Sequence, residues 1–146
     1  MGKRRKAREC SLQILFQLDF MDGDFQQIQD QYWSHRKLSK EIQEYSRWLI
    51  SGILSHKEEI DALIESVSQH WSLSRMTAVD RNILRMAVFE LIYEKSVVSA
   101  VVINEAIEIA KKYSTYEAAD FVNGILDAVR KKRNKSKKEM NGKKHG

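Results

Sequence analysis

The chain has 146 residues and a single cysteine, Cys10, so one domain with a sizeable core is expected and no disulfide can form within it. No apolar run reaches the roughly 18–20 residues that span a membrane, and no apolar segment with a small-residue cleavage site follows the basic N-terminus, which disfavours a signal peptide and fits a cytoplasmic protein. The formal net charge of +5 is unevenly spread. Residues 1–9 hold five cations and one acid, residues 10–129 hold eleven cations and eighteen acids, and residues 130–146 hold nine cations and one acid.

The first half of the chain is predicted to form four helices, since the chain contains no proline and the apolar residues recur at helical spacing. The first helix, within 3–20, carries two apolar stripes and is followed by Gly23, a candidate C′ residue. Asp24 can cap a second helix, and Ser39 can cap a third. The capping box "SHKE" predicts that a fourth helix starts near His56.

The second half is predicted to form three more helices. Thr77 with Asp80 resembles a helix start and leads into "NILRMAVFELIY", which is apolar almost all round and is therefore expected to be the central buried helix. The β-branched run "SVVSAVVI" is also compatible with a strand, but the helical spacing after it favours a helix from about Ser99. A second capping box, "STYE", precedes the last helix, in which Asn123-Gly124 is expected to permit close packing. Seven helices with short connections predict an all-α fold, a single compact helical domain.

The two basic ends of the chain call for different interpretations. Residues 130–146 have almost no apolar side chains, so this tail is expected to be disordered beyond a helical domain of residues 1–129, adding only non-specific attraction to polyanions. At the N-terminus, five cations run directly into a helix. Each cation in the first turn destabilises the helix by roughly 0.3–1 kcal/mol through its interaction with the macrodipole. Helix stability therefore does not explain these cations, whereas an external binding partner can explain them.

Motifs for catalysis are absent from the sequence. The four histidines lack the i, i+4 spacing of metal ligands, namely His35, His56, His70 and His145. No Gly-rich phosphate loop is present, and Cys10 lies in a helical apolar pattern that favours a core position. Glu105 and Glu108 are spaced as a solvated helix face. We therefore predict that the chain is not an enzyme and uses no metal or cofactor.

Three segments of the chain carry a family resemblance: "RRKARECSLQILFQLD", "WSLSRMTAVDRNILRMAVFELIY" and "VVINEAIEIAKKYSTYEAADFVNGILDAV". In order and spacing they resemble the NusB family, the bacterial transcription antitermination factors, and together they cover most of residues 4–129. Two positions depart from the family pattern. Val98 stands where a proline is usual, which blurs the start of a helix, and Phe16 stands where a tyrosine is frequent, which removes a hydroxyl.

The resemblance implies an all-helical protein of two packed helical subdomains. It implies binding to the boxA element of ribosomal RNA leaders, jointly with the ribosomal protein S-ten (NusE), in an assembly with NusA, NusG and RNA polymerase. Family members are monomers or homodimers. Arginine-rich RNA-binding segments of the family match the N-terminal cations of this chain, namely Lys3, Arg4, Arg5, Lys6 and Arg8. Arginine suits this role because its planar guanidinium binds phosphate bidentately and stacks on bases.

Four further residues match family positions, each with an ordinary structural alternative. Phe121 matches an aromatic near the RNA surface, yet it also fits the core stripe of its helix. Phe16, Asp80 and Arg85 match the surface toward S-ten. Phe16 fits a core position equally well, and Asp80 can merely cap its helix. Arg85 can pair with Asp80 or Arg81 instead.

Two other function classes stay open. Some rRNA cytosine methyltransferases carry a NusB-like N-terminal region, so an accessory role is conceivable, although the chain contains no Gly-rich nucleotide-binding strand–turn–helix of its own. The other class is a protein-only adaptor whose basic ends merely confer solubility. RNA binding with and without residues 1–8 separates the adaptor from an RNA-binding protein.

Overall fold

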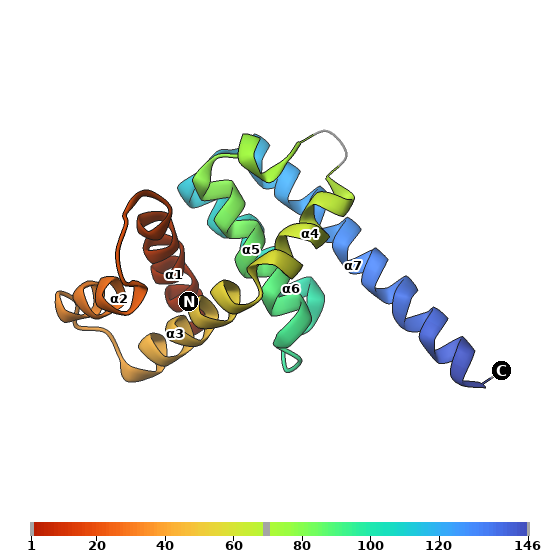
Figure 1. The fold of residues 1–146 in the computed structure, drawn as a ribbon, viewed down its shortest axis with the longest axis horizontal. Helices are drawn as coiled ribbons and strands as arrows, with labels where there is room; N and C mark the ends of the chain where they lie inside the picture. Colours follow the sequence, from red (N-terminus) through yellow and green to blue (C-terminus); the bar gives the residue numbers. More distant parts are fainter. Residues whose placement is uncertain (1, 69–70, 146) are drawn as a thin grey trace.

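The computed structural model describes residues 2–68 and 71–145, with side chains described as far as residue 140. Within this part of the chain the regular structure consists of seven α-helices and one 3₁₀ turn, without a strand (Figure 1). The elements are α1 (Lys3–Phe20), α2 (Phe25–Ser34), α3 (Lys40–Ser55), α4 (Lys57–Val67), η1 (Leu73–Arg75), α5 (Ala78–Tyr93), α6 (Ser99–Tyr113) and α7 (Tyr116–His145). The all-α prediction is confirmed, and none of the described helices is both long and apolar enough to cross a membrane.

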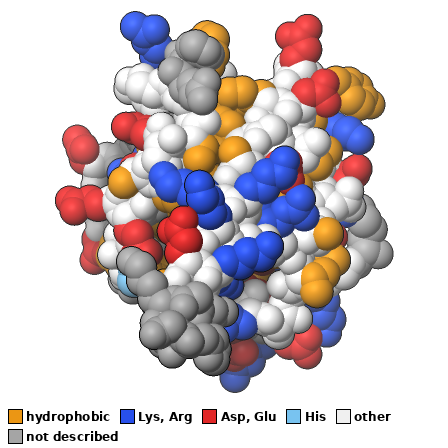
Figure 2. Space-filling view, turned by 90° about the vertical axis from the view of Figure 1, so that its right-hand side faces the viewer, with side chains coloured by type: hydrophobic (Ala, Val, Ile, Leu, Met, Phe, Trp, Pro, Cys, Tyr) orange, Lys and Arg blue, Asp and Glu red, His pale blue; other side chains and the backbone are white. Residues whose placement is uncertain are grey.

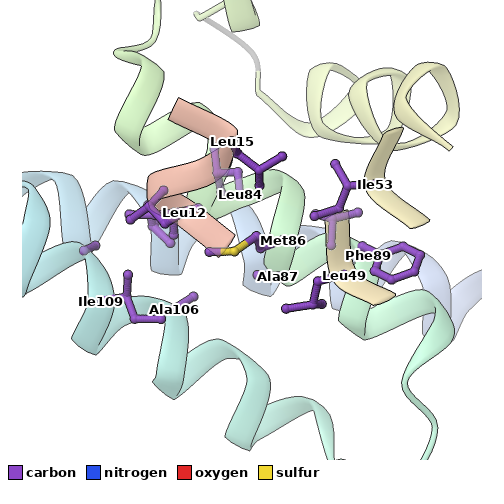
Figure 3. Packing of buried hydrophobic residues seen from close by; sticks show 14 of the residues in the cluster. Leu12, Leu15, Leu49, Ile53, Leu84, Met86, Ala87, Phe89, Ala106 and Ile109 are labelled. Carbon is purple, nitrogen blue, oxygen red and sulfur yellow. The ribbon is translucent and has the colours of Figure 1, made fainter. Parts of the chain in front are cut away.

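Helix α5 lies at the centre of the fold and contacts α1, α3, α4, α6 and α7. Its residues Asn82 to Glu90 are all buried, which confirms the central helix predicted from "NILRMAVFELIY". Figure 3 shows Leu84, Met86, Ala87 and Phe89 of this helix among side chains from α1, α3 and α6. Helices α1 to α3 pack together on one side and α6 and α7 on the other, so α5 joins two helical groups (Figure 1).

Three of the predicted helix starts are capped as expected. The side-chain oxygens of Asp24, Ser39 and Thr77 accept hydrogen bonds from backbone amides two or three residues later, at 2.9, 3.4 and 3.1 Å. Each bond satisfies an amide that has no partner within the first turn of the helix. These starts depend only on residues adjacent in sequence, which is why the sequence predicts them.

Both capping boxes are shifted in the structure. Ser55, the serine of "SHKE", is still the last residue of α3, and α4 follows after His56, which makes no side-chain cap bond. At the start of α7 the cap is Thr115 rather than Ser114, because the threonine hydroxyl accepts from the Ala118 amide at 2.9 Å. The predicted starts are therefore correct to within a residue or two, while the capping residues are wrong.

Gly23 does not end α1. The helix ends at Phe20, and Met21 is already extended. Gly23 lies in the connection to α2 with φ of +149°, a backbone conformation that favours glycine. The glycine is used for the turn between two helices rather than for a helix cap.

Helix α7 continues through residues 130–145, where disorder is predicted from the sequence. Asp127 pairs with Arg130 at 2.5 Å and with Lys131 at 3.1 Å along the helix. Further on, the helix borders a hollow of about 620 Å³ beside α4, whose lining includes Leu63, Ile92 and Met140. The disorder prediction is corrected because lysine and arginine are good helix formers and the packed first half of α7 supplies the nucleus.

Two glycines inside helices have opposite surroundings. A Cβ atom on Gly52 of α3 would lie 2.0 Å from the Phe89 ring, so glycine permits the close approach of α3 to α5. A Cβ atom on Gly124 of α7 would meet nothing within 4 Å. The expectation that Asn123-Gly124 permits close packing is therefore wrong, and Gly52 has that role.

Gly52→Ala is expected to lower the free energy of unfolding by about 1–3 kcal/mol, because the Phe89 ring, which contacts Trp48 and Tyr93, has to shift. Gly124→Ala is the matched control, and in its open helical position it should raise the stability by up to ~1 kcal/mol. Urea unfolding followed by circular dichroism measures both. Equal stability of the two variants would contradict the close approach of α3 and α5.

Candidate nucleic-acid interface

The five N-terminal cations occupy the first two turns of α1, beside the C-terminal end of α5. Lys3, Arg4 and Lys6 are exposed, Arg5 is half-buried, and Arg8 is buried. The N-cap of α1 forms no side-chain hydrogen bond, and the first turn contains no acid. The unfavourable interaction with the helix macrodipole is therefore real, and compensating negative charge has to come from other elements.

Acids on three other parts of the chain supply that charge. The pairs are Lys3–Glu41 at 3.1 Å, Arg4–Glu94 at 3.7 Å and Arg5–Glu105. The pairs of Lys3 and Arg4 are exposed or partly exposed and each contribute about 1 kcal/mol or less, so an anionic ligand can compete for these two cations. The pair of Arg5 with Glu105 is largely shielded from solvent. Lys6 makes no salt bridge within the described chain.

Arg8 differs from the other four cations. Its Nε and Nη2 donate to the two carboxylate oxygens of Glu90 at 2.7 and 2.8 Å, and both side chains are almost fully buried. Burial alone lowers the pKa of Arg8, but the hydrogen bond and attraction to Glu90 outweigh it, so the pKa is raised. The Tyr45 hydroxyl donates to the same carboxylate at 2.6 Å. The charge of Arg8 is therefore neutralised inside the fold, which leaves this side chain less suited to an RNA contact than the four cations before it.

Phe121 lies against the opposite end of α5 from these cations. Its ring packs partly against the core and lines a hollow of about 320 Å³ near the start of α5, together with Trp71, Arg75 and Asp80. Helix α5 has 16 residues and is therefore ~24 Å long at 1.5 Å per residue. The structure does not bring Phe121 together with the α1 cations. Both interpretations of Phe121 fit its position, since the ring is half in the core and half in an open hollow.

Phe16 is an exposed side chain on the last part of α1. Its exposed fraction is 41%, and its ring centroid lies 4.9 Å from that of Phe20. It borders a mainly apolar hollow of about 460 Å³, whose lining includes Leu12, Val79 and Tyr113. The alternative core role is therefore wrong, and Phe16 remains available to a partner.

Asp80 and Arg85 are less accessible. Thr77 caps α5, and the Oδ1 atom of Asp80 is buried with no hydrogen-bond partner among the described residues. The buried guanidinium of Arg85 donates to both carboxylate oxygens of Asp61 in α4, at 2.8 and 3.0 Å. The structural alternative, in which Arg85 pairs with Asp80 or Arg81, is wrong, because Asp61 supplies the carboxylate.

Trp48 is an exposed aromatic residue beside the α1 cations that the sequence alone does not identify. Trp48 of α3 is 40% exposed and shares a hollow of about 400 Å³ with Lys3, Arg4 and Tyr45. The Arg4 guanidinium lies 4.7 Å from the centre of the Tyr45 ring. The i, i+3 spacing of Tyr45 and Trp48 is a signal for neighbouring rings on a helix, but only the fold brings α1 against them.

A second group of cations lies on the C-terminal part of α7. Figure 2 looks at the face onto which this end of the helix projects, and Lys and Arg side chains gather there. Arg130 and Lys131 pair with Asp127. Five further cations form no salt bridge within the described residues, namely Lys132, Arg133, Lys135, Lys137 and Lys138. All except the partly buried Arg133 are exposed, and their charge is suited to attracting a polyanion.

Comparison with known proteins gives a consistent result. A model of the NusB family matches residues 5–131. The transcription antitermination protein NusB of Syntrophus aciditrophicus (strain SB) is 40% identical over 140 residues, which are 96% of this chain and 87% of the relative. The protein of the same name from Desulfitobacterium hafniense (strain Y51) is 44% identical over 141 residues, 94% of this chain and 95% of the relative.

Solved structures are similar over the same extent. The structure of T. maritima NusB has a TM-score of 0.79 and 42% identity, covering 88% of this chain and 90% of that one. A chain in the structure of antitermination factors NusB and NusE in complex with dsRNA has a TM-score of 0.80 and 32% identity, covering 90% of this chain and 98% of that one.

Arg8→Ala is expected to lower the free energy of unfolding by about 3–5 kcal/mol, because it leaves the buried Glu90 carboxylate without its cation. Lys6→Ala is the control on the exposed face of the same helix and should change the stability by no more than ~0.5 kcal/mol. Denaturant unfolding measures both. If Arg8→Ala were as stable as Lys6→Ala, the buried ion pair would not support the fold.

Proposed function

The chain belongs to the NusB family, and on that premise we propose that it is a transcription antitermination factor that binds boxA RNA of ribosomal RNA leaders together with the ribosomal protein S-ten (NusE). The heterodimer on RNA nucleates an assembly with NusA, NusG and RNA polymerase. The protein acts in the cytoplasm as a binding protein rather than an enzyme. The observation that carries the proposal is the similarity, covering 90% of this chain, to a chain in the structure of NusB and NusE in complex with dsRNA.

The exposed cations of α1 bind phosphates in this proposal. Lys3, Arg4 and Lys6 reach solvent, and Arg5 is partly accessible. Arg8 has a different role, because its ion pair with Glu90 holds this turn of α1 against the body. Phe121 stacks on a base at the other end of α5, so a single strand of several nucleotides is needed to reach both places.

The S-ten surface is proposed around Phe16. An exposed aromatic beside an apolar hollow is the kind of anchor that dominates protein interfaces. Asp80 contributes from the start of α5. Arg85 acts indirectly in this proposal, since its bidentate bond to Asp61 fixes α4 relative to α5.

A binding titration tests the proposed function. It compares boxA RNA with a scrambled RNA of equal composition, each with and without S-ten. We expect tighter binding to boxA RNA and a further gain when S-ten is present. Equal affinity for the two RNAs in both conditions would contradict the antitermination role, and no RNA binding at all would favour a protein-only adaptor.

The salt dependence of RNA binding should report the α1 cations. Each phosphate contact contributes about 0.7 to the slope of log affinity against log salt for single strands, so Lys3→Ala, Arg4→Ala and Lys6→Ala together should flatten the slope by up to about 2. The control is the triple variant Lys37→Ala, Lys57→Ala and Lys111→Ala, which removes the same number of charges from exposed lysines elsewhere. If both triple variants had the same slope, the start of α1 would not be the phosphate-binding element.

Phe16→Ala is expected to weaken S-ten binding by roughly tenfold or more, the usual cost of truncating an aromatic anchor. The affinity for boxA RNA alone should stay unchanged, because Phe16 lies more than two turns from the α1 cations. Calorimetric titration with S-ten measures the effect, and Tyr116→Ala, another exposed aromatic, serves as control. Unchanged S-ten affinity in Phe16→Ala would place the partner surface elsewhere.

A further inference from the structure

The hollow between the start of α1 and the first half of α3 contains three kinds of group that can hold a nucleotide. Its volume is about 400 Å³, and it is lined by Lys3, Arg4, Glu41, Glu44, Tyr45 and Trp48. Cations bind the phosphates of a single strand, and aromatic rings stack on its bases. Carboxylates accept hydrogen bonds from the amino groups on base edges.

Trp48 is held in place yet accessible. Its ring centroid lies 5.0 Å from that of Phe89 and 5.4 Å from that of Tyr45, while 40% of the residue remains exposed. Tyr45 is itself fixed by the hydrogen bond from its hydroxyl to Glu90. An aromatic ring that is already packed on one side loses little freedom when a base covers the other, so it is a preorganised stacking surface.

The charged groups around Trp48 are arranged for the remainder of a nucleotide. Lys3 makes an exposed pair with Glu41, and Arg4 makes a long, partly exposed pair with Glu94, so phosphate can replace the acid in each. Glu44 forms only a long, exposed salt bridge with Lys40 one turn earlier, at 3.8 Å, which a ligand can replace at its carboxylate. At the position of the exocyclic group, the carboxylate accepts a hydrogen bond from the amine of cytosine, whereas the O4 carbonyl of uracil is repelled by it.

Resting on the proposed function, we propose that Trp48 stacks on one nucleotide of the bound RNA, with Lys3 and Arg4 at its phosphates and Glu44 at the edge of its base. This contact lies at the C-terminal end of α5, separate from Phe121. The occupant is therefore a single-stranded nucleotide with an amino-bearing base.

Trp48→Leu and Trp48→Phe test the stacking. We measure affinity for boxA RNA with several single-stranded nucleotides on each side, at two or more salt concentrations. Trp48→Leu should weaken binding roughly 5- to 150-fold, the usual loss for one stacked base, without changing the salt slope. Trp48→Phe keeps a stacking ring and should retain most of the affinity. Phe20→Leu, an exposed aromatic at the far end of α1, is the matched control and should bind like the parent.

The outcomes separate this proposal from the proposed function. If the parent protein prefers boxA over scrambled RNA and Trp48→Leu binds as tightly as the parent, the stacking proposal is wrong while the function stands. If Trp48→Phe loses as much affinity as Trp48→Leu, or Phe20→Leu loses an equal amount, stacking at Trp48 is likewise overturned. If the parent shows no preference for boxA, the proposed function fails, and loss of general RNA affinity in Trp48→Leu still supports the stacking contact.

Glu44→Gln tests the base edge. Oligocytidine and oligouridine of eight nucleotides have rings of equal size and differ only at position 4 and at N3, so their comparison reports contacts to this edge of the base. The parent should bind oligocytidine several-fold more tightly, Glu44→Gln should narrow that difference, and Trp48→Leu should weaken binding to both. An undiminished preference in Glu44→Gln, or no preference in the parent, would overturn the role given to the carboxylate.

Discussion

One buried ion pair, between Arg8 of α1 and Glu90 of α5, fixes the basic start of α1 against the central helix. A buried charge is tolerated only when it is paired and hydrogen-bonded, and removal of one partner costs far more than an exposed pair contributes. Here the guanidinium binds both carboxylate oxygens, and Tyr45 of α3 adds its hydroxyl. Burial and the charge of Glu90 raise the pKa of Tyr45, so the phenol stays protonated and keeps donating. Three helices are thereby fixed relative to one another at a single point.

The Arg8–Glu90 ion pair also positions residues on the surface. Arg8 lies in the same two turns as Lys3, Arg4 and Lys6, so the ion pair that buries its charge also presents the neighbouring cations to solvent. The hydrogen bond from Tyr45 to Glu90 likewise fixes the ring beside Trp48. The unfavourable placement of cations at a helix N-terminus is offset by acids from α3, α6 and the segment after α5. The pairs of Lys3 and Arg4 are long or exposed, so phosphate can replace the acids there.

Helix α5 sets the spacing between the surfaces. Its C-terminal end adjoins the α1 cations and Trp48, while its N-terminal end adjoins Phe121 and Asp80. A ligand that uses both ends has to be extended over about 24 Å, the length of a 16-residue helix. A flexible single strand meets that requirement more readily than a compact small molecule. The basic end of α7 provides a third positive region whose attraction is not tied to any base.

The sequence by itself determined the helices, because their signals are local. Asp24, Ser39 and Thr77 cap helices as their neighbours predict, and the apolar run of α5 could be buried only at the centre. The family resemblance likewise follows from linear motifs, which the family match confirms.

Only the tertiary structure decided what each charged or aromatic side chain does, because its partner lies far away in sequence. Arg8 and Lys6 look alike in the chain, yet Glu90, 82 residues later, buries the first and leaves the second exposed. Arg85 finds Asp61 rather than a neighbour, and Phe16 fits an apolar stripe but faces outward. Trp48 lies beside cations only because α1 packs against α3. Helix α7 continues into a segment of its own sequence that is almost free of apolar residues. Helix periodicity specifies which residues share a face, but the fold determines whether that face packs against another element or is exposed to solvent.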